Sequence, residues 1–106
     1  MEDIKGRVFA AAGLVEYQPG TVVIRTLVKK PTGTITLFAF DKGQGLSEHT
    51  APFDALILAL DGEATFHLSG HPHRLKTGDL FLLPAGEPHA LDALERFKMA
   101  LVMIRS

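Results

Sequence analysis

Glycine and proline interrupt this sequence at short and fairly even intervals, and this spacing constrains the fold more than any other feature. Ten glycines and six prolines are spread over 106 residues. The stretches between them are short and rich in β-branched and aromatic residues, a composition that favours strands. We therefore expect an all-β fold, a sandwich or a barrel, whose strands cover residues 21–28, 33–41, 53–61, 63–69, 79–84 and 96–104.

Periodicity and turn signals support these strands. Residues 34–40 alternate with a period of two, which places two threonines and two phenylalanines on one face. The Asp-Gly pair at 61–62 and the Ser-Gly pair at 69–70 predict hairpins, and residues 76–79 predict a third tight turn. Residues 2–14 remain compatible with a helical turn, an edge strand or an irregular segment.

Composition excludes several kinds of partner. The net charge of −1 and the scattered basic residues provide no field for nucleic acid or an anionic membrane, so we expect neither. No cysteine is present, which excludes disulfides and thiolate chemistry. We recognise no secretory signal and no apolar run long enough to cross a bilayer. We therefore expect a cytoplasmic protein that forms a single domain over residues 1–106.

Seven residues between positions 43 and 93 follow two spaced motifs. The first motif, over about 43–62, contains two glycines and a histidine, and the second, over about 78–93, contains two glycines, a proline and a histidine. These residues are Gly43, His49, Gly62, Gly78, Pro84, Gly86 and His89. The pattern resembles the two motifs of the cupin superfamily. This resemblance implies a cupin-type double-stranded β-helix, or jelly-roll, barrel.

The resemblance also implies a metal site, formed by two histidines and a glutamate of the first motif and the histidine of the second. This sequence keeps His49 and His89 but has Ala51 and Ala55 at the other two ligand positions. Positions 49, 51, 55 and 57 share one face of an extended strand, so we expect a pocket lined by Ala51, Ala55 and Ile57. A divalent ion (zinc, nickel, manganese or iron) would be held there by two imidazoles alone, which predicts weak binding.

Other polar residues are weaker candidates for the pocket. Asp54 has the wrong parity and reaches the pocket only if a bulge shifts the strand; otherwise it caps a neighbouring loop. His67 reaches it only if the polar face of its strand is the inner face. The two histidines of residues 71–73 flank a proline and are expected in an exposed loop. Arg25 and Lys98 would bind an anionic group if they point into the barrel, which parity alone does not decide.

Apolar residues remain on the face opposite the expected pocket. Leu56, Leu58 and Leu60 form a stripe there, and both faces of residues 80–83 are apolar. A contiguous apolar surface is normally covered, here by the N-terminal segment or by another copy of the chain. Because a two-fold pair is the usual symmetric solution, we expect a homodimer.

Three functions are compatible with these features. The first is a metal-dependent cupin that acts on a small polar substrate as an oxidoreductase, isomerase or lyase, with the metal held by His49 and His89. The second is a metal-free module that binds or senses a small molecule in the same barrel, which the cavity left by Ala51 and Ala55 favours. The third is a structural or interaction protein, favoured only by the apolar outer faces.

Overall fold

The computed structural model describes residues 4–105. Within that range one short 3-10 helix precedes eight strands, so the expected all-β class is confirmed. The elements are η1 (Ala11–Leu14), β1 (Val22–Lys30), β2 (Gly33–Phe40), β3 (Gly45–His49), β4 (Ala55–Leu68), β5 (His71–Lys76), β6 (Leu80–Leu83), β7 (His89–Asp92) and β8 (Phe97–Ile104).

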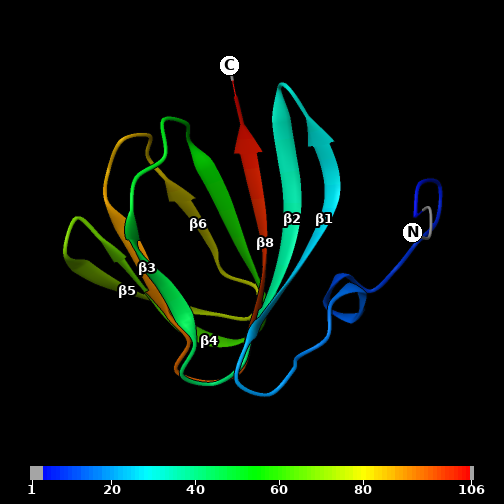
Figure 1. The fold of residues 1–106 in the computed structure, drawn as a ribbon, viewed down its shortest axis with the longest axis horizontal. Coiled ribbons are helices and arrows are strands. Elements are labelled where there is room, and N and C mark those ends of the chain that lie inside the picture. Colours follow the sequence, from blue (N-terminus) through cyan, green and yellow to red (C-terminus); the bar gives the residue numbers. More distant parts are fainter. Residues whose placement is uncertain (1–3, 106) are drawn as a thin grey trace.

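The strands form one strongly curled antiparallel sheet. Its order is β1-β2-β8-β4-β7-β3, and β5 and β6 pair with the two ends of β4. The first half of β4 pairs with β6 and β8 and its second half with β5 and β7. The long strand β4 therefore belongs to both walls of the barrel. Figure 1 shows β1, β2 and β8 on one side and β3 and β5 on the other.

The hairpin expected at Asp61-Gly62 is wrong. These residues lie inside β4, where the register against β8 shifts between Ala59 and Asp61. Gly62 has the positive φ of 75° that the sequence signal implies, but the chain uses it to bend a continuous strand from one wall to the other. A bulge and a turn both exploit this freedom of glycine, and the dipeptide alone does not distinguish them.

The other two turn predictions are confirmed. Ser69 and Gly70 adopt φ values of 49° and 81° and join β4 to β5. The N–H of Asp79 donates to the carbonyl oxygen of Lys76 at 2.9 Å and closes the third turn. The strands β3, β5 and β7 are short and polar, so strand propensity did not reveal them; tertiary pairing overrides propensity there.

The main core lies between the two walls. Phe38 and Phe40 point into it from β2 with their rings stacked 5.7 Å apart, as the alternation predicts. The largest inward side chains of the other strands complete it: Ile57, Phe66, Leu91, Phe97 and Met99. Burial of each of these side chains contributes about 1.5–3 kcal/mol, so this face of the sheet holds the barrel closed.

The N-terminal segment packs on the outside of the barrel. Val15 is buried with Leu37 and Ala39, which alternate with the inward phenylalanines of β2. Two cations on the outer face fasten the segment: Arg25 donates to the carbonyl of Leu14 at 2.9 Å, and Lys98 donates to that of Ala12 at 2.6 Å. Figure 1 shows the segment beyond β1. Of residues 2–14, for which the sequence left three alternatives, residues 11–14 form a 3-10 turn and residues 4–10 form neither helix nor strand, while residues 2–3 lie outside the described range.

A second part of the outer face remains uncovered. It is formed by β4, β6 and β8 and includes Leu80, Leu82 and Ile104, which are 63%, 60% and 62% exposed. Of the apolar residues predicted on this face, the N-terminal segment covers only Leu60, whereas Leu58, Leu80 and Leu82 remain exposed. No helix within residues 4–105 is long and apolar enough to cross a membrane.

Candidate functional site

A cavity of about 100 Å³ lies inside the barrel between the two walls. Two of its lining residues are histidines, and the other nine are apolar. The lining comprises His49, His89, Leu46, Ala51, Ala55, Ile57, Phe66, Leu83, Met99, Leu101 and Met103. The residues expected from the resemblance thus line one cavity together. The sequence did not indicate the other six lining residues, which are Leu46, Phe66, Leu83 and the three β8 residues, although the alternation of 97–104 contains the signal for the last three.

The two imidazoles face each other across neighbouring strands. His49 on β3 is the register partner of His89 on β7, and their ring centroids lie 4.3 Å apart with planes at 66°. A register shift between Leu46 and His49 marks an irregularity in β3 just before the histidine. His89 is 8% exposed, whereas His49 is exposed at the mouth of the cavity. One imidazole is therefore largely desolvated and the other is open to water.

Backbone carbonyls determine which nitrogen of each ring carries the proton. Nδ1 of His49 lies 2.7 Å from the carbonyl oxygen of Ser47, and Nδ1 of His89 lies 3.2 Å from that of Glu87. A carbonyl only accepts, so Nδ1–H is the donor in both neutral rings. Nε2 then bears the lone pair, and no hydrogen bond from within residues 4–105 reaches it.

His89 resists protonation. Burial lowers the pKa of His89 below its ordinary value of 6.5, and the neighbouring charge of His49 lowers it further, against an opposing contribution from the Glu87 carbonyl. Desolvation disfavours the imidazolium because an apolar wall replaces water around it. At neutral pH the cavity therefore presents an uncharged His89 with an available lone pair.

The lining does not complete the four-ligand metal site that the resemblance implies. Ala51 and Ala55 contribute no ligand atom, and among the described residues no three histidine, cysteine or acidic side chains are grouped as a metal site would require. Two neutral imidazoles leave most coordination positions of a divalent ion to water or to a bound molecule. A tightly held resident metal does not fit this donor set.

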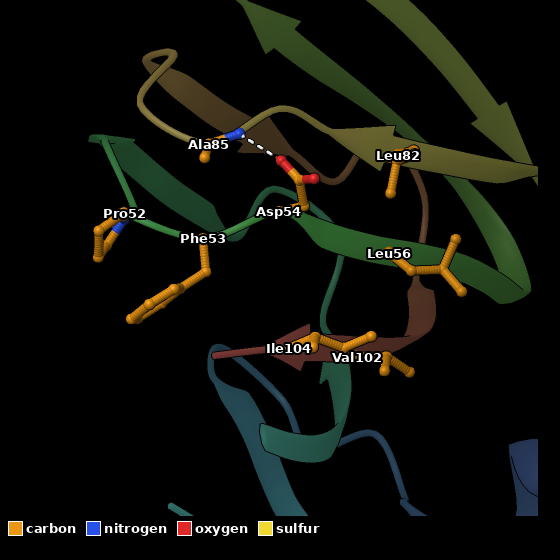
Figure 2. Close-up of a pocket in the computed structure, with 8 residues that line it drawn as sticks. All are labelled: Pro52, Phe53, Asp54, Leu56, Leu82, Ala85, Val102 and Ile104. Carbon is orange, nitrogen blue, oxygen red and sulfur yellow. Dashed lines mark hydrogen bonds between the residues drawn. The ribbon is translucent and has the colours of Figure 1, made fainter. Parts of the chain in front are cut away.

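The structure places Asp54 and His67 outside the cavity. Asp54 accepts a hydrogen bond from the N–H of Ala85 at 2.8 Å and caps that loop on the outer side (Figure 2). His67 forms a 3.1 Å contact with Asp92. Ala64 and Phe66 are the buried residues of this part of β4. The polar face that carries His67 is therefore the outer one, because the barrel interior is apolar.

The other polar candidates do not line the cavity. Arg25 and Lys98 contact the N-terminal segment on the outside, so neither supplies a cation to the interior. His71 and His73 are exposed, as expected, but they lie in β5 rather than in a loop. The ring of His73 lies 5.0 Å from that of Phe81.

A separate groove of about 500 Å³ lies on the uncovered part of the outer face. Asp54 is its only charged lining residue, and the others are Pro52, Phe53, Leu56, Leu82, Ala85, Val102 and Ile104. Figure 2 shows Leu56 and Leu82 from adjacent strands beside Val102 and Ile104 of β8. Alternate residues of the same strands line the inner cavity, so β4, β6 and β8 separate two apolar hollows.

A curled antiparallel sheet with histidines at the mouth of an interior cavity defines a small β-barrel with a ligand-type pocket. Residues 36–105 match the family model described as Cupin domain. The chain therefore belongs to the cupin domain family, and the expected double-stranded β-helix fold is confirmed.

Solved structures of similar proteins support this assignment. A conserved protein of unknown function from Streptococcus pyogenes is 34% identical, with a TM-score of 0.93 over 99% of this chain and 93% of its own. A cupin superfamily protein from Desulfitobacterium hafniense is 29% identical, with a TM-score of 0.91 over 96% and 94% of the two chains. A cupin 2 conserved barrel domain protein from Leptotrichia buccalis is 44% identical, with a TM-score of 0.86 over 89% of this chain and 46% of its own.

One curated protein is also similar in sequence. Dimethylsulfoniopropionate lyase DddQ from Ruegeria pomeroyi is 43% identical over 58 residues, which are 54% of this chain and 29% of the lyase. The chain thus spans less than a third of the length of this relative.

Proposed function

We propose that this protein binds a small molecule inside its barrel, in the cavity whose mouth is formed by His49 and His89. The observation that carries the proposal is the lining itself: apolar side chains together with two imidazoles whose Nε2 atoms are free to bind. A concave apolar site with a few well-placed polar groups is the usual character of a ligand pocket. Ala51 and Ala55 provide the space where larger side chains would otherwise fill the barrel.

A second candidate is a weak metal site in the same place. Its support is the fixed tautomer of each imidazole, since metal-binding histidines commonly donate their other ring N–H to a carbonyl. The similarity to a lyase makes an enzymatic role of this kind reasonable. His49 and His89 would hold a divalent ion such as zinc, nickel, manganese or iron, which would supply Lewis acidity to a bound substrate.

Thermal unfolding of chelator-treated protein with a diverse panel of small metabolites tests the first proposal. We expect a subset of compounds to raise the melting temperature, because a ligand that binds only the folded state stabilises it. The same compounds should shift the NMR signals of Ile57 and Met99 in the cavity. If no compound of the panel binds the metal-free protein, the proposal fails.

The same panel, repeated with each metal ion, distinguishes the second candidate. Saturable binding of an added divalent ion by the wild-type protein, and its loss in His89→Gln, would favour the metal site. Binding that is equal with and without metal would exclude a role for the ion.

We also propose that the uncovered outer face of β4, β6 and β8 packs against the same face of a second copy. Leu80, Leu82 and Ile104 are 63%, 60% and 62% exposed on this face. Among the described residues that line the groove, only Asp54 is charged, and it lies at the end of the groove beside Ala85. An apolar surface without opposing charges is compatible with its own copy under two-fold symmetry. The expected homodimer would bury this face, and its test is given in the Discussion.

A further inference from the structure

We infer that the cavity selects a neutral molecule of about the size of one six-membered ring that carries a single hydrogen-bond donor, such as a phenol or a small alcohol. This inference rests on the proposed function, because it concerns the same cavity. It adds the chemical class of the ligand, which follows from the polarity, the charge and the dimensions of the lining.

The side chains that line the cavity offer a ligand hydrogen-bond acceptors and no donors. Both Nδ1–H groups are already used by the carbonyls of Ser47 and Glu87. What remains on each ring is an Nε2 lone pair, and no other lining side chain carries a nitrogen or oxygen atom. A ligand that donates a hydrogen bond complements this arrangement, whereas a carbonyl or ether oxygen would meet another acceptor.

The cavity also lacks a charge that could neutralise an ionised ligand. Lys98 and Arg25 are directed to the N-terminal segment outside the barrel. No carboxylate is present among the lining residues to pair with an ammonium group. An unpaired charge in such a site would lose its hydration without compensation.

The dimensions restrict the apolar part of the ligand. A closed apolar cavity of roughly 150 Å³ accommodates one benzene molecule, whereas this cavity measures about 100 Å³ and opens at the exposed His49, so one six-membered ring is the upper limit for the apolar part. Ile57, Phe66 and Met99 are almost fully buried, whereas His49 is exposed. The inner part of such a ring would lie against the buried residues, and the part that carries the donor would extend to the mouth beside the imidazoles.

The donor requirement should appear as selectivity between compounds of similar size. A ligand without a donor removes water from Nε2 of the largely buried His89 and leaves that atom unpaired. The cost of an unsatisfied buried acceptor corresponds to a loss of affinity of about tenfold or more.

NMR titration of the chelator-treated full chain with phenol, anisole, toluene and benzoate tests the inference. We expect phenol to shift the signals of the cavity residues. Anisole and toluene should bind about tenfold more weakly or worse, and benzoate should bind more weakly still. Anisole or benzoate binding as tightly as phenol would overturn the inference but not the proposed pocket. No effect of any of the four probes would also overturn it, while the metabolite panel would still test the proposed function separately.

Two further measurements guard against misfolded variants. Imidazole ¹⁵N shifts of the wild-type protein should show protonated Nδ1 and unprotonated Nε2 on both rings, and phenol should move the Nε2 signal of His89. A protonated Nε2 in the free protein would contradict the inference. His89→Phe should abolish the preference for phenol over toluene, whereas the matched outer-face change His67→Phe should preserve it.

Discussion

His49 stands directly opposite His89 across the β3–β7 pair, although forty positions separate them in the sequence. Opposite residues of an antiparallel pair project on the same side of the sheet. Their rings therefore converge, with centroids 4.3 Å apart, at the mouth of an apolar cavity. This pairing is the structural basis of the proposed ligand site.

Filling the cavity should abolish ligand binding without unfolding the barrel. Ala55 is buried and lines the cavity beside the histidines. The change Ala55→Leu should reduce the affinity for any cavity ligand about tenfold or more and should change the free energy of unfolding by about 1–3 kcal/mol. Titration and urea unfolding measure the two effects. Ala90→Leu, on the outer face of β7, is the matched control and should leave affinity unchanged; equal effects of both variants would argue against the cavity as the binding site.

The stability of the protein should depend on pH through His89. Because burial lowers the pKa of His89 from its ordinary 6.5, the unfolded chain takes up this proton at a higher pH than the folded chain does. The stabilising contribution is therefore complete above about pH 6.5 and falls as the pH drops from there to the pKa of the folded state. Urea unfolding between pH 8 and pH 5 should show this slope. It should be reduced in His89→Gln and retained in His71→Gln, which alters an exposed histidine of β5.

The oligomeric state should depend on the uncovered outer face. Leu82 is 60% exposed there, and Leu82→Glu would place a charge in the proposed interface. We expect the wild-type chain to have the mass of a dimer in light scattering and the variant to dissociate about tenfold more readily or worse. Ile24→Glu alters a residue of similar exposure, 58%, on β1 and should leave the dimer intact. A wild-type monomer at micromolar concentration would contradict the proposal.

The bend of β4 should not tolerate a side chain at Gly62. Gly62 has a φ of 75°, and a Cβ at this position would overlap the carbonyl oxygen of Arg96. Gly62→Ala should therefore lower the free energy of unfolding by about 2–5 kcal/mol, from backbone strain and steric overlap together. Gly70→Ala has a similar φ of 81° but open space around it, so it should cost only about 1–2 kcal/mol. Equal losses in the two variants would show that the steric overlap is unimportant.

The attachment of the N-terminal segment should depend on Lys98. Its Nζ donates to the carbonyl of Ala12 at 2.6 Å and lies 4.8 Å from the centre of the Tyr17 ring. Lys98→Ala should lower stability by about 1–3 kcal/mol and should make residues 4–17 more sensitive to proteases. Lys76→Ala, in the exposed part of β5, should change stability by less than about 0.5 kcal/mol. A segment that stays protease-resistant in Lys98→Ala would mean that its apolar contacts suffice.

Part of the candidate site was predictable because its signals are local. The spacing of His49, Ala51 and Ala55 matches the cupin pattern, and these residues do line one cavity. The expected single extended face is wrong, because His49 ends β3, Ala55 begins β4 and residues 50–54 form an irregular connection between them. The positions of Asp54 and His67 were not predictable in the same way. The alternation of side chains along a strand shows that each of these two residues lies on the other face from its sequence neighbours. Only the closed barrel shows that the apolar face of β4 is the inner one.

The sequence by itself determined the all-β class, most strand positions, the alternation of faces and the loss of two metal ligands. Only the tertiary structure decided that β4 continues through Asp61-Gly62, that the N-terminal segment covers one outer region, and that backbone carbonyls hold Nδ1 of both histidines. The physical reason is that alternation and glycine conformation arise between near neighbours in the chain. The inner face, the bend and the hydrogen-bond partners arise from pairings between distant strands.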